Sequence, residues 1–393
     1  MTPMYQVLKK AKDNSGKYRV IFIAALLLSF HYYLITYINS TFIKQSTGID
    51  LVGILYALGS VLNIVLFLKA PSLIRKYGNL NFIKVISLIE ILALLSMALS
   101  KNVPVIIFAF IVHHSINAII LSCLDMYLED TSDTKTMGKT RGTFLTIISI
   151  AAVISPLAIG SLVKNGDFSK IYFFSVFFML IFLWWVTQNF KRDPITQFKE
   201  VNILSELKEF LRNKKVKSVT ICYALLQFFF SWMIIYVPLY LVESAGFNWS
   251  ETALIISISL LPFLLFQIPI GEMADKKLDE REIIVGGFML TTFALLFFPF
   301  IPAGHFVFWT IALFLARTGA SVIETATESY FFRGIKGKDE LIEVFRISSP
   351  FAFIVGPLVG SVLLIFLPFK TIFLVLSAIM FSGIYFGAKI SKD

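Results

Sequence analysis

Residues 170–190 read KIYFFSVFFMLIFLWWVTQNF, and no charged side chain follows Lys170 in this stretch. An apolar run of about twenty residues is long enough to cross the roughly 30 Å hydrocarbon core of a bilayer as an α-helix. Strands of a membrane barrel would instead be about ten residues long and would alternate apolar with polar residues, which this stretch does not do. The segment therefore predicts a transmembrane helix.

Similar segments occur along the whole chain, so the sequence predicts an all-α membrane protein with twelve transmembrane helices. The composition agrees, because 57% of the 393 residues are hydrophobic and only 15% are charged, whereas soluble domains are roughly one quarter charged. The expected spans are residues 19–43, 49–69, 80–100, 104–124, 142–163, 170–190, 217–242, 250–272, 283–301, 306–331, 346–366 and 369–389.

Basic residues are distributed unevenly among the loops. The N-terminal tail, the even-numbered loops and the C-terminal tail hold 28 Lys and Arg residues, whereas the odd-numbered loops hold five. The positive-inside rule then places both termini in the cytoplasm and the chain in the cytoplasmic (inner) membrane. Loops that face anionic lipid account for the net charge of +10, so no nucleic-acid partner is expected. Cys123 and Cys222 are isolated thiols without metal-site spacing.

The chain divides into two halves of similar length. We expect one six-helix bundle over residues 1–190, a second over 217–393, and a cytoplasmic linker over 191–216 that contains an amphipathic helix. That helix lies on the membrane interface or is a solvated connection, and the sequence leaves both open.

Matching residues recur in the two halves at an offset near 200. The matched pairs are Gly48 with Gly246, Asp125 and Glu129 with Glu324 and Glu328, Ser155-Pro156-Leu157 with Gly356-Pro357-Leu358, and Gly160-Ser161 with Gly360-Ser361. Two related bundles can rock about a site between them and open it to one side of the membrane at a time. The repeat therefore predicts two pseudo-symmetric bundles and a transport function.

A loop motif follows the eighth span, where residues 271–277 read GEMADKK. This run resembles the G-x-x-x-D-[RK] signature of the major facilitator superfamily, and the resemblance covers essentially the whole chain. In that family the acidic residue, here Asp275, and the basic residue after it, here Lys276, contribute to a cytoplasmic latch. The first copy of the motif has Arg75 at the acidic position, so we expect an asymmetric gate.

Carboxylates at i, i+4 spacing lie near the cytoplasmic ends of spans four and ten, and a basic residue starts the following span. The same arrangement occurs in both halves and is similar to the charge networks of the family. It predicts a cytoplasmic gate whose ion pairs form in one conformation and break in the other. Static solvated ion pairs are the alternative. Its members are Asp125, Glu129 and Arg141 in the first half and Glu324, Glu328 and Arg346 in the second.

The resemblance implies that spans one, four, seven and ten line a central cavity. The substrate-binding candidates on these spans are His31, Tyr32, Tyr37, His113, Asn117, Gln227, Trp232, Tyr236 and Arg317. Arg317 is the most informative, because an unpaired guanidinium in mid-membrane is costly. It either recruits an anionic or carbonyl-bearing solute, or pairs permanently with a carboxylate such as Glu324 or Glu90.

Several buried ionisable residues are candidates for proton coupling, because histidine titrates near neutral pH and a membrane carboxylate can carry a proton. The candidates are His31, His113, His114, Glu90 and Glu324. A histidine inside a membrane protein can also serve only as a hydrogen-bonded packing residue, so both interpretations stay open.

These features favour a monomeric secondary active transporter that moves a small solute by alternating access with H+ as the expected coupling ion. The element at 356–361 is similar to one that the family associates with exporters, although there it lies in span five, so import and export both stay open. No phosphate-binding glycine loop and no cofactor motif is found, and the chain is not expected to be an enzyme. Alternatives are a transport-inactive sensor or chaperone of the same fold and a lipid-handling membrane protein.

Overall fold

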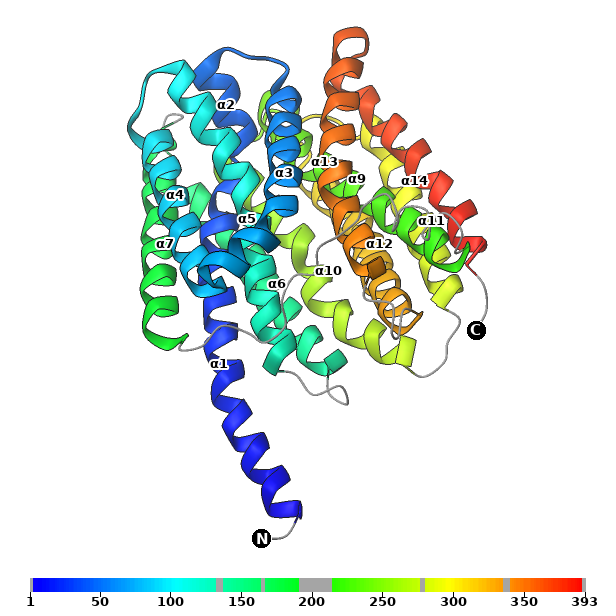
Figure 1. Ribbon diagram of the computed structural model, residues 1–393. Helices are drawn as coiled ribbons and strands as arrows, with labels where there is room; N and C mark the ends of the chain where they lie inside the picture. The colour runs from blue at the N-terminus through cyan, green and yellow to red at the C-terminus, as the bar shows by residue number, and fades with distance from the viewer. Residues whose placement is uncertain are drawn as a thin grey trace.

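The computed structural model describes residues 3–131, 137–163, 167–190, 214–275, 280–334 and 340–390. Within these ranges the chain is built from helices, and twelve of them are long and apolar enough to cross a membrane (Figure 1). This confirms the all-α, twelve-helix expectation. The predicted linker helix lies almost entirely outside the described residues, because only residues 214–216 of it are included, as the start of the next helix.

The first half contains α1 (Pro3–Thr36), α2 (Asn39–Thr47), α3 (Val52–Tyr77), α4 (Asn79–Leu99), α5 (Val103–Thr131), α6 (Met137–Leu162) and α7 (Ser169–Asn189). The second half contains α9 (Lys214–Glu243), α10 (Trp249–Asp275), α11 (Glu280–Phe297), η1 (Phe298–Phe300), α12 (Phe306–Gly334), α13 (Glu340–Phe366), η2 (Phe369–Thr371) and α14 (Ile372–Ala388). Helices suit these apolar sequences because they satisfy every backbone hydrogen bond internally, which hydrocarbon requires.

Each half packs mainly on itself, and the halves meet along two seams. Helix α3 packs against α13, and α6 packs against α10. These are spans two and eleven and spans five and eight, so the seams are equivalent under the internal repeat. The solute path of a rocking two-bundle transporter lies between such seams.

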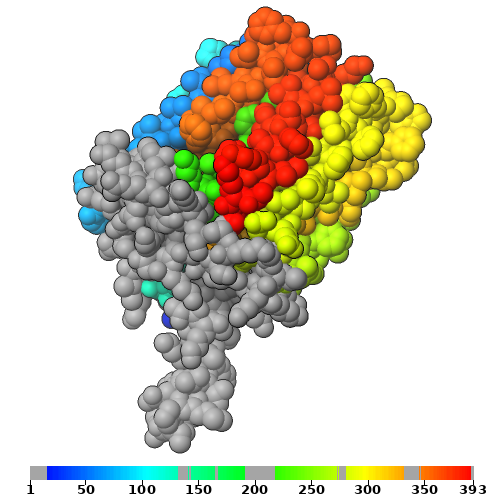
Figure 2. All heavy atoms as spheres, turned by 90° about the vertical axis from the view of Figure 1, so that its right-hand side faces the viewer, coloured from blue at the N-terminus to red at the C-terminus, as the bar shows by residue number. Residues whose placement is uncertain are grey.

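Apolar side chains cover the outside of the molecule as well as its core. Figure 2 shows α14 exposed between α13 and α11 on one outer face of the second half. Large apolar side chains on these three helices are exposed, namely Phe293, Phe297, Phe366, Phe381 and Tyr385. In water such a surface would drive association, whereas in a bilayer it contacts lipid tails.

Span one is interrupted, although a continuous span was expected over 19–43. Helix α1 ends at Thr36, and α2 starts at Asn39 after a two-residue turn. Helix α2 then ends at Thr47, and the capping residue Gly48 has a φ of 70°, in the left-handed region that glycine adopts without strain. Breaks of this kind in transporters commonly lie beside the solute site. The break therefore directs attention to Tyr37 and its neighbours.

The odd-numbered connections all lie at the end of the bundle away from the N-terminus, where Figure 1 shows α2 and the turn between α13 and α14. We call this end the distal face. It comprises residues 48–51, 100–102, 167–168, 244–248, 301–305 and 367–368 among those described. The charge distribution predicts that this face lies outside the cytoplasm.

Candidate functional site

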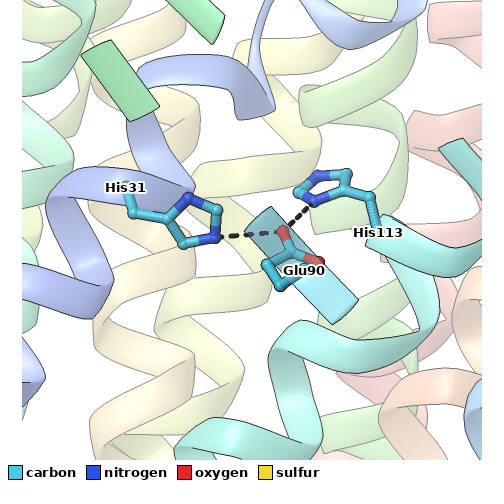
Figure 3. A group of neighbouring side chains, drawn as sticks. All are labelled: His31, Glu90 and His113. Carbon is cyan, nitrogen blue, oxygen red and sulfur yellow. Dashed lines mark hydrogen bonds and ion pairs between the residues drawn. The ribbon is translucent and has the colours of Figure 1, made fainter. Parts of the chain in front are cut away.

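A buried polar cluster lies inside the first half. It consists of His31 on α1, Glu90 on α4 and His113 on α5, whose side chains are at most 2% exposed. Figure 3 shows both imidazole rings directed at the same carboxylate from different helices. The sequence suggested Glu90 as a proton carrier or as a partner of Arg317. The structure shows that its partners are the two histidines.

One oxygen of Glu90 receives every polar contact that this carboxylate makes. Its Oε1 lies 2.5 Å from Nδ1 of His113, 3.2 Å from Nε2 of His31 and 3.3 Å from the amide nitrogen of Asn117. The other oxygen, Oε2, is buried without a hydrogen-bond partner. A buried carboxylate anion with one unsatisfied oxygen has an unfavourable free energy, so binding of a proton within the cluster is favoured.

Further polar groups contact the ring nitrogens of His31 and His113 that do not face Glu90. Nδ1 of His31 lies 2.7 Å from the Ser175 hydroxyl on α7, and that hydroxyl donates to the His31 carbonyl at 3.0 Å. Nε2 of His113 lies 3.3 Å from the Asn39 amide nitrogen, and the Tyr172 hydroxyl donates to Oδ1 of Asn39 at 2.7 Å. The cluster therefore spans α1, α2, α4, α5 and α7.

The same three residues offer a ligand set that suits transition metals, with ligand atoms within 4.8 Å of one another. Two ligands of one tetrahedral zinc ion, each about 2.0 Å from the metal, lie about 3.3 Å apart. The 2.5 Å separation of His113 Nδ1 from Glu90 Oε1 is shorter than this and corresponds to a strong charge-assisted hydrogen bond. The geometry fits a shared proton better than a metal ion.

Arg317 lies on α12 where the two halves face each other. It is 2% exposed, and its guanidinium lies 5.5 Å from the ring centre of Tyr37, in the break of span one. Its Nη1 has no hydrogen-bond partner, and no carboxylate of the described residues lies within 4 Å of it. The permanent pairs with Glu90 or Glu324 that sequence analysis considered do not form in this conformation.

A second carboxylate lies two turns along the same helix. Glu324 accepts a hydrogen bond from the amide of Gln267 on α10 at 3.1 Å, and Gln267 accepts one from Ser149 on α6 at 3.4 Å. This chain crosses from one half to the other. Tyr33 on α1 is close enough to both Arg317 and Glu324 to interact electrostatically with them. Among the described residues, the interface between the halves thus holds the buried cation Arg317 and the partly buried carboxylate Glu324.

His114 and the aromatic residues around it belong to the other seam. Nε2 of His114 lies 3.0 Å from the Ser60 hydroxyl, which donates to the Phe353 carbonyl on α13 at 3.3 Å. The ring of Tyr56 packs edge-on against His114, and its buried hydroxyl has no hydrogen-bond partner. His114 therefore contacts the facing half, whereas its neighbour His113 points into its own half.

The three candidates on α9 use their polar atoms within the second half. Trp232 donates to the Gly356 carbonyl at 2.8 Å, Tyr236 donates to the Pro357 carbonyl at 2.6 Å, and Gln227 accepts from the Ser349 hydroxyl at 2.9 Å. All of these bonds tie α9 to α13. Tyr32 on α1 is partly exposed and packs edge-on against Tyr33. A substrate role for these residues stays a prediction.

The predicted cytoplasmic gate is only partly described. Arg75 is exposed in the last turn of α3, and Asp125, Glu129, Glu324 and Glu328 are partly buried on α5 and α12. The side chains of Arg141, Asp275 and Arg346 and the whole of Lys276 lie outside the described residues. The gate therefore stays a prediction.

A set of contacts that the sequence did not predict closes the distal face. Lys44 on α2 bonds to Glu243 at the end of α9 at 2.8 Å, and Ser250 on α10 donates to the Gly160 carbonyl on α6 at 3.0 Å. Partial burial lowers the pKa of Lys44, but Glu243 and Asp50 outweigh it, so the pKa is raised above its usual value. The available signal was that Lys44 is one of only five basic residues in the odd-numbered loops.

The sequence model of the Major Facilitator Superfamily matches residues 21–338. The chain belongs to this superfamily. Its fold superposes on the crystal structure of a POT family transporter in complex with 5-aminolevulinic acid with a TM-score of 0.77, over 95% of this chain and 96% of that one, at 12% sequence identity. Identity this low shows a shared fold alone. No curated protein matches the chain in sequence.

Membership of the Major Facilitator Superfamily confirms the expected two-bundle fold and the transporter assignment. The chain is a multi-pass membrane protein that supports secondary active transport of a small solute, and it is not an enzyme.

Proposed function

We propose that this transporter moves an anionic or amphipathic small solute across the cytoplasmic membrane by alternating access, coupled to protons. In the proposed arrangement it acts as a monomer with both termini in the cytoplasm. The observation that carries the proposal is Arg317, a buried guanidinium at the interface between the halves that has an unsatisfied donor and no described carboxylate partner.

An anion supplies what Arg317 lacks. A guanidinium presents five donors in a planar fork that matches a carboxylate or phosphate, and such charge-assisted pairs are roughly twice as strong as neutral hydrogen bonds. In the solute-free protein, the face of the Tyr37 ring stabilises the guanidinium through a cation–π contact. The solved POT family transporter of similar fold holds an acid, 5-aminolevulinic acid, which is a ligand of the class we propose.

Glu324 is the proposed coupling group at this interface. It lies seven residues after Arg317, about 10 Å along the helix. Protonation of its carboxylate removes a negative charge near the anion site and so strengthens anion binding. By linkage, a bound anion strengthens proton binding to the same degree.

Two measurements test the anion proposal. The purified protein is screened by thermal unfolding against mono- and dicarboxylates, organic phosphates, sulfonates, amines and neutral amphiphiles. We expect anions to raise the midpoint for the natural protein and to have no such effect on Arg317→Gln. Arg19→Gln, which removes an exposed charge on α1, is the matched control and should respond like the natural protein.

Hits are then followed in proteoliposomes with an imposed pH gradient. A flux that depends on the gradient and is lost in Arg317→Gln supports the proposal, and Glu324→Gln should retain flux but lose the gradient dependence. Stabilisation by cations or neutral compounds alone, unchanged in Arg317→Gln, would exclude an anion site. Stabilisation without any flux would favour a sensor of the same fold.

A further inference from the structure

We infer that the His31–Glu90–His113 cluster is a second proton-binding site, and that its single dissociable proton holds the distal face closed through Asn39 and α2. The inference deepens the proposed transport cycle and rests on it for its physiological role. The site is separate from the interface that contains Arg317 and Glu324, because all its members belong to the first half.

The hydrogen-bond directions place one proton on His113. The hydroxyl of Tyr172 donates to Oδ1 of Asn39, so the amide nitrogen of Asn39 is the group that faces Nε2 of His113. An amide nitrogen can only donate, which makes Nε2 the acceptor. The proton of a neutral His113 is then on Nδ1, from which it is donated to Glu90 Oε1. The amide nitrogen of Asn117, 3.3 Å from the same Nδ1, donates instead to Glu90 Oε1 at 3.3 Å.

The same reasoning at His31 reveals an additional proton. The Ser175 hydroxyl donates to the His31 carbonyl, so its oxygen accepts from Nδ1–H of His31. Nε2 of His31 faces two oxygens, Oε1 of Glu90 and Oδ1 of Asn117, both at 3.2 Å. A bare nitrogen lone pair cannot bond to either oxygen. One proton must therefore lie between His31 and Glu90, as imidazolium with carboxylate or as imidazole with carboxylic acid.

Loss of this proton leaves a net negative charge in a site that is fully buried. The titratable groups that face Glu90 are His31 from α1 and His113 from α5, while Tyr172 on α7 is reached through Asn39. His114 turns away towards Ser60 on α3. No Lys or Arg of the described residues lies within 4 Å of the carboxylate. The deprotonated cluster therefore lacks a compensating cation and must rearrange.

Asn39 transmits that rearrangement to the distal face. It is the first residue of α2, and the same helix carries Lys44, which bonds to Glu243 in the second half. The two-residue break at Tyr37 and Ile38 allows α2 to move without α1. The break also touches Arg317 through the Tyr37 ring. Proton and solute thus act on one bistable element, which is what coupling requires.

The reaction at the site is a protonation alone. One N–H or O–H bond forms when the pair takes a proton from water, and the same bond breaks when the proton returns to water. In the loaded state His113 holds Asn39 and the distal face is closed, as in this structure. In the unloaded state Nε2 of His31 repels both oxygens, so the Glu90 carboxylate moves away from His31 together with the His113 ring that is bonded to it. Nε2 of His113 then leaves Asn39, and the Lys44–Glu243 contact is released.

The test measures the opening of the distal face in the full chain, in lipid nanodiscs and without added solute. Spin labels are attached at Lys101→Cys and Ala303→Cys, which are exposed on the distal ends of the two halves, in a background of Cys123→Ala and Cys222→Ala. We expect short label separations at acid pH and a growing long-separation population as the pH rises. Glu90→Gln, a neutral mimic of the loaded state, should keep the short separation at every pH.

Controls separate the site from general effects of pH. His305→Gln changes the exposed histidine of the distal face and should leave the response intact. Asn39→Ala cuts the link to α2, so the separations should lose their pH dependence while infrared difference spectra still detect loss of the buried proton. A natural protein without pH dependence, or a Glu90→Gln variant with full pH dependence, overturns the inference. Because no solute is present, failure of the Arg317 proposal would not affect this readout.

Discussion

The two halves share one scaffold and keep their ionisable groups in different places. The first half encloses His31, Glu90 and His113 within its own bundle, whereas the second half carries Arg317 and Glu324 on α12 at the interface with its partner half. The core of the second half uses hydroxyl-to-carbonyl bonds instead, such as Thr291 to the carbonyls of Gly287 and Ala316 at 3.0 and 3.3 Å. An ionisable group enclosed in one bundle can bind and release a proton, and a charged group at the interface can bind a solute.

The largest effect is expected from Glu90→Ala. This change leaves His31 and His113 buried without their shared partner, and removal of one member of a buried charged pair typically costs about 3–5 kcal/mol. Thr291→Ala in the second half is the matched change and should cost only about 1 kcal/mol. Equilibrium unfolding in detergent micelles measures both. Equal losses would show that the cluster is ordinary hydrogen-bonded packing.

Arg317→Met is expected to change stability in the opposite direction. An unpaired arginine at mid-membrane costs roughly 2.5–3.5 kcal/mol, so a similarly long apolar side chain should stabilise the solute-free protein by about 2 kcal/mol. The same variant should lose stabilisation by anions. The midpoint of unfolding with and without the best anion checks both effects. A destabilised variant would mean that Arg317 is structurally paired rather than held available for a solute.

Gly53→Ala tests the seam between α3 and α13. A Cβ atom there would collide with the Pro357 carbonyl and the hydroxyls of Ser361 and Tyr236, all in the second half. Overpacking of this kind typically costs about 1–3 kcal/mol, and here it should act mainly on the closed state. The label separation across the distal face should increase. Gly286→Ala, with no atom within 4 Å of its Cβ, should leave the separation unchanged.

The smallest effect is expected from Lys44→Gln. The Lys44–Glu243 contact is about one third exposed at Lys44, so solvent screening limits it to about 1 kcal/mol or less. Because the pKa of Lys44 is raised in the folded protein, this contribution is present at lower pH and is lost only as the pH rises above the usual value of 10.5. Between pH 5 and pH 8 Lys44 therefore keeps its charge. A response of the distal face in that range must come from a group other than Lys44. Lys44→Gln should keep the pH response, with the opening midpoint moved to lower pH by less than about one unit because the closed state is weakened.

The number of spans and the transporter class could be predicted from the sequence, since each depends on local hydropathy, charge or a repeat. The partners of the polar residues could not. Glu90 was singled out, but its pairing with His31 and His113 depends on which face each of three helices turns inward. Lys44 and Glu243 are 199 residues apart, and nothing local to either links them. Trp232 and Tyr236 were expected to face a cavity because the family resemblance places span seven at its wall, and here both donate hydrogen bonds to α13.

Because span one is interrupted, α2 can tilt as a short rigid helix about the break at Ile38. Lys44 lies six residues beyond Ile38, about 9 Å from the pivot at 1.5 Å per residue. A tilt of about 15°, comparable to the rotations of allosteric rigid bodies, would displace that end by about 2 Å. This displacement is enough to break a contact between atoms that now lie 2.8 Å from each other. In the proposed switch, protonation near one end of this nine-residue helix acts on the other half of the molecule through a small tilt of a helix that packs on α3, α5 and α9.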